Sequence, residues 1–571
     1  MCYGVTCSTC SKATWRGCGA HIPAALNGVP EDQWCTCTPR VTVGGKEYPP
    51  QNAMSIPAFA SKRGRWQLGV TPHTNPVLGA SMVVTITRSP PPTPIGADAL
   101  SFTNRNALIE QRLSPPAPDL IRRPRRHQVL RRLRYTAFCR NVQSIPLYFD
   151  ISSIFFTSAA TVVILYLVRC VYSPLWRLPG PRISAFTSLL LRLHELQGNR
   201  TRHIHHLHEQ YGPVVRVSPN EVCFTSYDAV KEIYCSGGSG YDKTEFYNLF
   251  RVYGRRTMFT TLNKEDHAKR KRIIADRYAN SNVLRPAPLS GIQERSLNFI
   301  KRCEASVGAS HDIFMSLHSY ACDCVTHHLF HPYGTNCLEN KADEDMMHQV
   351  AADDSLQNRL VQHYSPALHR ALSGVLYFFA KPRETPLADD FVMTSSGKPD
   401  PAQFTLLSRL HEKSSALDRV DMAGECLDHM AAGIDTTGDG LCFLMWELSQ
   451  PRSMRFQEML QREVRENPGV PFDKLPFLDA VVQEGLRCFP AIPMSLPRCV
   501  PPGGRSIDGY SIPENTVVSC QAYSVHRIND VVFPKPDVFD PERWMQSTGD
   551  AERKRLMFAF ANGGRGCVGK Q

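Results

Sequence analysis

The stretch "FANGGRGCVG", Phe560–Gly569, decides how the rest of the chain is interpreted. A single cysteine, Cys567, follows the run Gly-Gly-Arg-Gly, and Arg565 stands two positions before it. A backbone with so little side-chain bulk can approach a large, flat ligand closely. Arginine is the side chain best shaped to bind a carboxylate through two N–H groups. The stretch therefore predicts a loop that binds a flat cofactor carrying acidic groups.

The spacing Phe-x2-Gly-x-Arg-x-Cys-x-Gly, which begins at Phe560, resembles the cytochrome P450 family, the haem-thiolate monooxygenases. The resemblance implies that Cys567 is the axial ligand of the iron of haem b, and that Phe560 and Arg565 belong to the haem site. A thiolate ligand pushes electron density onto the iron and favours O–O cleavage. The alternative is a glycine-rich turn with an incidental cysteine.

A second motif, "AAGIDTTGDGLCFLMWELS", spans Ala431–Ser449. Its apolar residues recur at helical intervals, but its middle holds glycines, which destabilise helices, and threonines, whose hydroxyls compete for helix carbonyls. We expect a locally opened helix whose groove admits dioxygen, with Asp435 and Thr436 relaying protons. The motif matches the Ala-Gly-x-Asp-Thr-Thr pattern of the family, which places Gly433 in the haem site. The alternative is a slack core helix.

A third motif, "EGLR", places Glu484 and Arg487 on one helix face. Taken alone, such a pair is most often exposed and contributes little to stability. The family resemblance adds Arg543, from "VFDPERW", and implies a buried structural network of the three residues that holds the cysteine loop.

The resemblance also implies further contacts with the haem propionates. Arg498 in "SLPRCVPPGG" matches a propionate-binding position, and His267 in "EDHAKRKRII" matches a histidine that reaches the haem. Four residues after His267 the family has an arginine, whereas this chain has Lys271. Lysine supplies the charge without the two-pronged geometry.

The chain divides into four segments: a Cys-rich segment at 1–50, a Pro- and Arg-rich linker at 51–145, a transmembrane anchor at 146–172 and the haem domain at 173–571. Residues 101–145 carry ten arginines and two acidic residues, so they account for most of the net charge of +12. We therefore discount nucleic-acid binding and expect the linker to be disordered.

The Cys-rich segment pairs soft metal ligands at short intervals, which suits tetrahedral zinc. The alternative is a set of unrelated free thiols. The segment also resembles a family of small fungal Cys-rich proteins, from which no function is carried over. The candidate ligands are Cys7, Cys10, Cys18, His21, Cys35 and Cys37.

The anchor prediction rests on "ISSIFFTSAATVVILYLV", Ile151–Val168, which carries no charge over eighteen residues. This length is at the lower edge of what spans a bilayer. Arg169, Tyr172 and Trp176 follow as interfacial anchors. The alternative is a buried core helix. The resemblance implies a single-pass protein of the endoplasmic reticulum with a cytosolic catalytic domain.

These features predict a mostly α fold with a small β portion, the cytochrome P450 fold, for 173–571. The resemblance implies insertion of one oxygen atom of O2 into a hydrophobic small molecule of secondary metabolism. The segments Tyr247–Thr260 and Ala491–Leu496 are candidate walls of the substrate pocket. Because the chain has no second domain of the size of a reductase, electrons are expected from NADPH through a separate flavoprotein reductase.

Two alternative functions are a non-catalytic haem-binding product and a protein whose function resides in the Cys-rich zinc segment. Members of the family continue beyond the cysteine with a helix and a small sheet, so we expect a C-terminally truncated and poorly active chain. We also expect that residues 1–145 come from a composite gene model rather than from the native protein.

Overall fold

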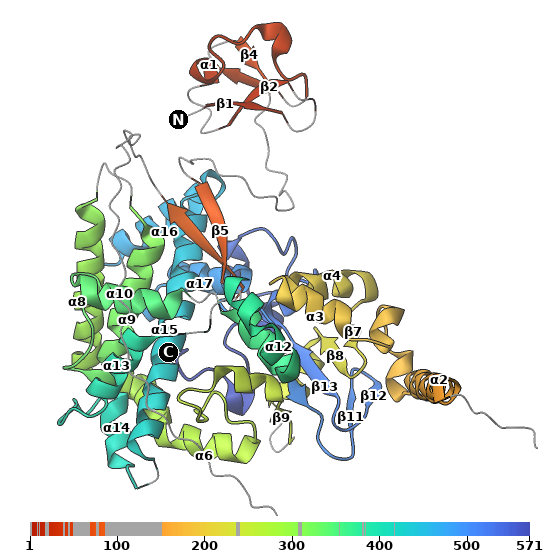
Figure 1. Ribbon diagram of the computed structural model, residues 1–571. Helices are drawn as coiled ribbons and strands as arrows, with labels where there is room; N and C mark the ends of the chain where they lie inside the picture. The colour runs from red at the N-terminus through yellow and green to blue at the C-terminus, as the bar shows by residue number, and fades with distance from the viewer. Residues whose placement is uncertain are drawn as a thin grey trace, which may run out of the picture. The chain divides into compact units, whose positions relative to one another are not determined.

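The computed structural model describes residues 3–7, 10, 12–16, 22–37, 40–43, 46–49, 69–75, 79–85, 151–235, 240–306, 311–352, 355–379, 382, 384–415 and 417–570. The chain separates into two units, Met1–Trp66 and Gln67–Gln571, whose elements are drawn in Figure 1. Each unit has its own buried apolar core.

The first unit is built from two small antiparallel pairs and one turn of helix. Strand β1 (Tyr3–Thr6) pairs with β2 (Ala13–Arg16), and β3 (Val41–Val43) pairs with β4 (Lys46–Tyr48). The short helix α1 (Ile22–Ala25) lies between these pairs in the sequence.

A hairpin of β5 (Gly69–Asn75) and β6 (Gly79–Thr85) lies within the segment expected to be disordered. Disorder was expected for the whole linker, whereas these two segments pair as strands. The rest of the 51–145 linker, including its arginine-rich part, lies outside the described residues.

Helix α2 (Ile151–Val171) covers the predicted membrane anchor. Its apolar side chains from Phe155 to Val168 are exposed, and Phe155 and Phe156 show 69% and 70% of their surface. Among the residues that the structure describes, no helix has both the length and the apolarity needed to cross a membrane. The prediction of a transmembrane helix is therefore not confirmed.

The second motif lies on the longest described helix, α15 (Arg419–Leu448), which packs along α9 (Ile313–Phe330) in one core (Figure 1). The helix is continuous from end to end, so the expected local opening is not present. A Cβ atom on Gly433 would lie 2.6 Å from the Val325 side chain, and one on Gly438 would lie 2.7 Å from the ring of His318. These glycines allow the two helices to approach closely.

A five-stranded sheet lies beside the helices, in the order β7-β8-β13-β10-β9. Strand β13 runs parallel to β8, and the other neighbours are antiparallel. A separate hairpin joins β11 (Arg505–Ile507) to β12 (Tyr510–Ile512). The five strands are β7 (Val214–Ser218), β8 (Glu221–Phe224), β9 (Asp242–Lys243), β10 (Arg498–Cys499) and β13 (Val517–Cys520).

Helices make up most of the second unit, which confirms the predicted mostly α fold with a small sheet. The remaining helices are α3 (Leu189–Leu196), α4 (Arg200–Tyr211), α5 (Tyr227–Val230), α6 (Lys264–Ile274), α7 (Asn280–Val283), α8 (Pro286–Glu304), α10 (Lys341–Ala351), α11 (Leu356–Tyr364), α12 (Pro366–Phe379), α13 (Pro386–Ser395), α14 (Leu406–Glu412), α16 (Met454–Glu466), α17 (Pro476–Cys488), α18 (Ala522–Val525) and α19 (Asp550–Leu556).

Candidate cofactor site around Cys567

The loop that carries Cys567 is closed by its own backbone. The Cys567 N–H donates to the Phe560 carbonyl at 2.9 Å, and the Gly566 N–H donates to the Gly563 carbonyl at 2.9 Å. Gly563 has a φ of +69°, and a Cβ atom there would lie 1.9 Å from the Tyr234 carbonyl oxygen. Only glycine fits this position, because the backbone is left-handed and the neighbouring chain is too close for a side chain.

Lys271 on α6 holds the same loop from the outside. Its Nζ donates to the carbonyls of Gly564 and Gly566, both at 3.0 Å. Desolvation lowers the pKa of Lys271, while the neighbouring Cys567 opposes this shift. In the structure the ammonium group binds the loop backbone, and the contact with haem that the family resemblance implies stays a prediction. Lys271 is thus a positioning residue for the cysteine.

Cys567 itself is exposed at the edge of an open cavity of about 380 Å³. The surrounding walls still desolvate the thiol and raise its pKa, against the Gly569 amide and the charges of Lys271 and Lys570. The other lining residues are Lys271, Ala275, Tyr278, Ala279, Asn280, Val568 and Lys570.

A basic cluster is buried near the cysteine loop, and it comprises Lys243, His267, Arg498 and Arg565. Strand pairing between β9 and β10 sets Lys243 opposite Arg498. The Arg498 Nη1 donates to the Tyr247 hydroxyl at 2.8 Å, and the Lys243 ammonium lies 4.5 Å from the centre of the Tyr247 ring. The cluster thus combines residues from a strand pair, from α6 and from the cysteine loop.

Burial and neighbouring cations lower the pKa of Lys243, His267 and Arg565. Burial and the neighbouring arginines lower the pKa of Lys243 well below its ordinary value. The same causes lower the pKa of His267 to about 3, so its ring is neutral, and that of Arg565 to about 10. The buried Nε and Nη1 of Arg565 have no hydrogen-bond partner among the described residues. A buried excess of positive charge with unused donors fits a ligand that carries carboxylates.

Asp435 and Thr436 occupy adjacent positions near the middle of α15, and both are partly buried. The Thr436 hydroxyl donates to the Ala432 carbonyl at 2.7 Å, as a threonine in a helix interior often does. Gly433, which was assigned to the haem site, lies against Val325 of α9.

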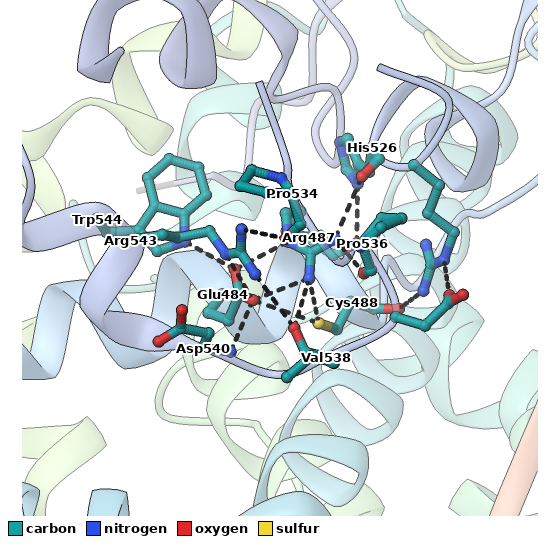
Figure 2. A network of polar contacts seen from close by, with 12 residues as sticks. Glu484, Arg487, Cys488, His526, Pro534, Pro536, Val538, Asp540, Arg543 and Trp544 are labelled. Atoms are coloured by element: carbon teal, nitrogen blue, oxygen red, sulfur yellow. Dashed lines mark hydrogen bonds and ion pairs between the residues drawn. The ribbon is translucent and has the colours of Figure 1, made fainter. Parts of the chain in front are cut away.

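Glu484, Arg487 and Arg543 meet in one buried network (Figure 2). Arg487 binds both carboxylate oxygens of Glu484, each at 2.8 Å, and the Arg543 Nε reaches Oε1 at 3.1 Å. The Trp544 indole N–H and the Asp540 backbone N–H each donate to the same carboxylate at 2.9 Å. Neither Glu484 nor Arg487 exposes any surface.

The two arginines donate their remaining N–H groups to backbone carbonyls. Arg487 donates to Pro536 at 2.7 Å, and Arg543 donates to Pro534 at 3.0 Å (Figure 2). Both also reach the carbonyl of Val538, at 3.2 and 3.3 Å. The network therefore fixes the path of the segment that leads towards the cysteine loop.

His526 connects this network to the cysteine loop. Its Nδ1–H donates to the Arg487 carbonyl at 3.0 Å, and its Nε2 accepts from the Phe558 backbone N–H at 2.8 Å. Phe558 lies two positions before Phe560, whose carbonyl closes the loop. Burial lowers the pKa of His526 to about 3, so the ring is neutral, as these two bonds require.

The two predicted wall segments of a substrate pocket meet at one cavity. Leu249 and Phe250 from the first segment line it together with Met494 from the second. Its volume of about 70 Å³ is well below that of a pocket for a drug-sized ligand.

Replacing Glu484 with glutamine should leave Arg487 and Arg543 buried without a counter-charge. We expect Glu484→Gln to lower the free energy of unfolding by about 3–5 kcal/mol. Urea unfolding followed by tryptophan fluorescence measures the change.

Glu542→Gln is the matched control, since Glu542 forms an exposed pair with Arg455 at 2.8 Å. Exposed pairs contribute at most about 1 kcal/mol. Equal losses in the two variants would contradict a special role of the buried network.

The neutral ring of His526 predicts acid sensitivity. A folded-state pKa of about 3 lies below the unfolded value, so this stability is complete above pH ~6.5 and is lost as the pH falls towards 3. Glutamine does not titrate and can accept from Phe558. His526→Gln should therefore be less stable than the unchanged protein near pH 7.5 but lose less stability on acidification.

Urea midpoints measured near neutral pH and near pH ~5 test this expectation. His206→Gln on α4, whose side chain is 61% exposed, serves as the control. The same acid-induced loss in His526→Gln and in the control would show that other buried histidines account for the pH dependence.

The sequence of the chain is similar to those of known proteins. The family model "Cytochrome P450" matches residues 178–571, and a model described as "Domain of unknown function (DUF8730)" matches residues 1–45. "Cytochrome P450 monooxygenase orf2" of Aspergillus niger is 28% identical over 73% of this chain and 87% of its own length.

Two further relatives come from other fungi. "Cytochrome P450 monooxygenase stcB" of Emericella nidulans is 28% identical over 70% of this chain and 79% of its own length. "Conidiogenone synthase PchP450" of Penicillium rubens is 26% identical over 71% of this chain and 85% of its own length. The family model covers more than half of the sequence, and the chain belongs to the cytochrome P450 family of monooxygenases.

Proposed function

We propose that the protein inserts one oxygen atom of O2 into a hydrophobic small molecule of fungal secondary metabolism, with haem b bound through Cys567. The observation that carries the proposal is the loop of Cys567, closed by its own backbone beside a buried basic cluster. The name of the Penicillium rubens relative, a conidiogenone synthase, supports a role in secondary metabolism.

The residues present fit haem on two independent features. Cys567 offers a sulfur ligand at an open cavity of about 380 Å³. The basic cluster offers charge and unused N–H donors of Arg565 for the two propionates. When bound, haem with a thiolate ligand supplies the iron centre at which O2 is cleaved.

The chain's own residues position this chemistry and supply protons. Lys271 and the backbone bond to Phe560 hold the cysteine loop. We assign Arg498, Arg565 and Lys243 to the propionates. We assign Asp435 and Thr436 to proton delivery, because both side chains are partly buried near the middle of α15 and carry groups that can transfer protons.

Cys567→Ala tests the proposal directly. The unchanged protein should show the CO-difference spectrum of thiolate-ligated haem, and the variant should lose that band because its side chain has no metal ligand. Cys303→Ala, on α8, should leave the spectrum unchanged. A spectrum typical of histidine-ligated haem in the unchanged protein would refute thiolate ligation in this chain.

The variant Lys243→Met should change haem affinity and thermal stability in opposite directions. Because burial and neighbouring cations disfavour the charged form of Lys243, its removal should raise the thermal midpoint of the haem-free protein. The same change should weaken haem binding by about 10- to 100-fold through the loss of one charged hydrogen bond.

Haem titration and thermal unfolding of the two proteins measure these opposite effects. Lys269→Met, an exposed lysine on α6, should change neither. Unchanged haem affinity in Lys243→Met would remove Lys243 from the propionate site.

We further propose that electrons come from a separate NADPH-dependent flavoprotein reductase. We also propose that the protein is attached to the membrane of the endoplasmic reticulum. The exposed apolar side chains of α2 support attachment to a membrane. Turnover with NADPH in the purified protein without a reductase would refute the need for a separate reductase. If α2 attaches the protein to the membrane, deletion of 151–171 should release the protein from the membrane fraction.

A further inference from the structure

The described residues of the first unit form a very small apolar core. Trp34 stacks on Tyr48 with the ring centres 5.4 Å apart, and its indole N–H donates to the Val29 carbonyl at 3.0 Å. Among the described residues of this unit, only Ile22 and Leu26 join these two rings as buried members of the cluster. A core of this size stabilises a domain weakly, and natural domains of this size commonly add a metal or disulfides.

Two separate turns bring four cysteine sulfurs together in this unit. Cys7 and Cys10 lie between β1 and β2, and Cys35 and Cys37 follow the short 3-10 helix at Glu31–Gln33. The Cys35 N–H donates to the Ala13 carbonyl of β2 at 2.7 Å, which joins the second turn to the first hairpin. All four sulfurs lie within 4.8 Å of one another.

The spacing of the sulfurs suits one tetrahedral metal ion. Zinc–sulfur bonds of about 2.3 Å in a tetrahedron place the sulfurs about 3.8 Å apart. Here Cys10 and Cys35 are 3.3 Å apart and Cys7 and Cys37 are 4.0 Å apart. A disulfide would need about 2.05 Å.

The surroundings of the sulfurs also suit a closed site. Cys7 and Cys35 are buried, and the Cys37 N–H points at the Cys35 sulfur at 3.4 Å. Backbone amides that donate to ligand sulfurs orient them and stabilise their negative charge. Four protein ligands leave no position open for a substrate, so the site is structural in type.

We propose that Cys7, Cys10, Cys35 and Cys37 bind one zinc ion, which stabilises the first unit. Cys18 and His21, the other two ligands expected from the sequence, lie outside the described residues, and four sulfurs already complete a tetrahedral site. The proposal does not depend on the haem function.

Metal analysis of the full-length protein by mass spectrometry tests the proposal. We expect about one zinc ion per chain, and less than a tenth of that in Cys35→Ser. Cys303→Ser, on α8, should keep its zinc. Haem is measured separately, so that iron bound outside haem is recognised, and the CO-difference spectrum should be the same in all three proteins.

Alkylation of the unchanged protein gives an answer even if Cys35→Ser does not fold. Peptide mass spectrometry should show the four cysteines protected from iodoacetamide, and a zinc chelator should make them reactive. Full zinc content in a folded Cys35→Ser, non-haem iron in place of zinc, or a Cys10–Cys35 disulfide in freshly purified protein would each overturn the proposal.

Discussion

The buried carboxylate of Glu484 is the group on which the order around Cys567 depends. Its charge is tolerated without solvent because Arg487 and Arg543 bind it. Each arginine then uses its other N–H groups on backbone carbonyls between Pro534 and Val538. Such an ion cluster adds little net stability over an apolar core, but it cannot lose one member without leaving a buried charge. It therefore holds the segment before the cysteine loop in one arrangement.

A chain of hydrogen bonds to the backbone connects this network to the cysteine loop. His526 joins the carbonyl of Arg487 to the N–H of Phe558, and the Phe560 carbonyl closes the loop on the N–H of Cys567. Lys271 holds the loop from α6, independently of the network. The Glu484 network and helix α6, which are far apart in the sequence, thus both position the loop that carries the Cys567 sulfur.

In the basic cluster, unlike the Glu484 network, charges of the same sign are buried together. Lys243 and Arg565 are held where burial and neighbouring charges disfavour them, and Arg565 keeps buried donors without a partner among the described residues. Burying these charges together destabilises the protein, and an anionic ligand bound there would offset this cost. Local violations of good packing and charge pairing are typical of functional sites.

The sequence alone determined the mostly α fold, the family and the candidate ligand Cys567, because these depend on local patterns and on motifs of characteristic spacing. The meeting of Glu484 with Arg487 also follows from local spacing, whereas the approach of Cys10 to Cys35 joins two turns that are 25 positions apart. Tertiary structure decided the rest. Gly438 fits against His318, and Lys243 lies opposite Arg498, through contacts between segments that are far apart along the chain. No local pattern records such contacts, because packing of distant elements alone determines which side chains become buried together.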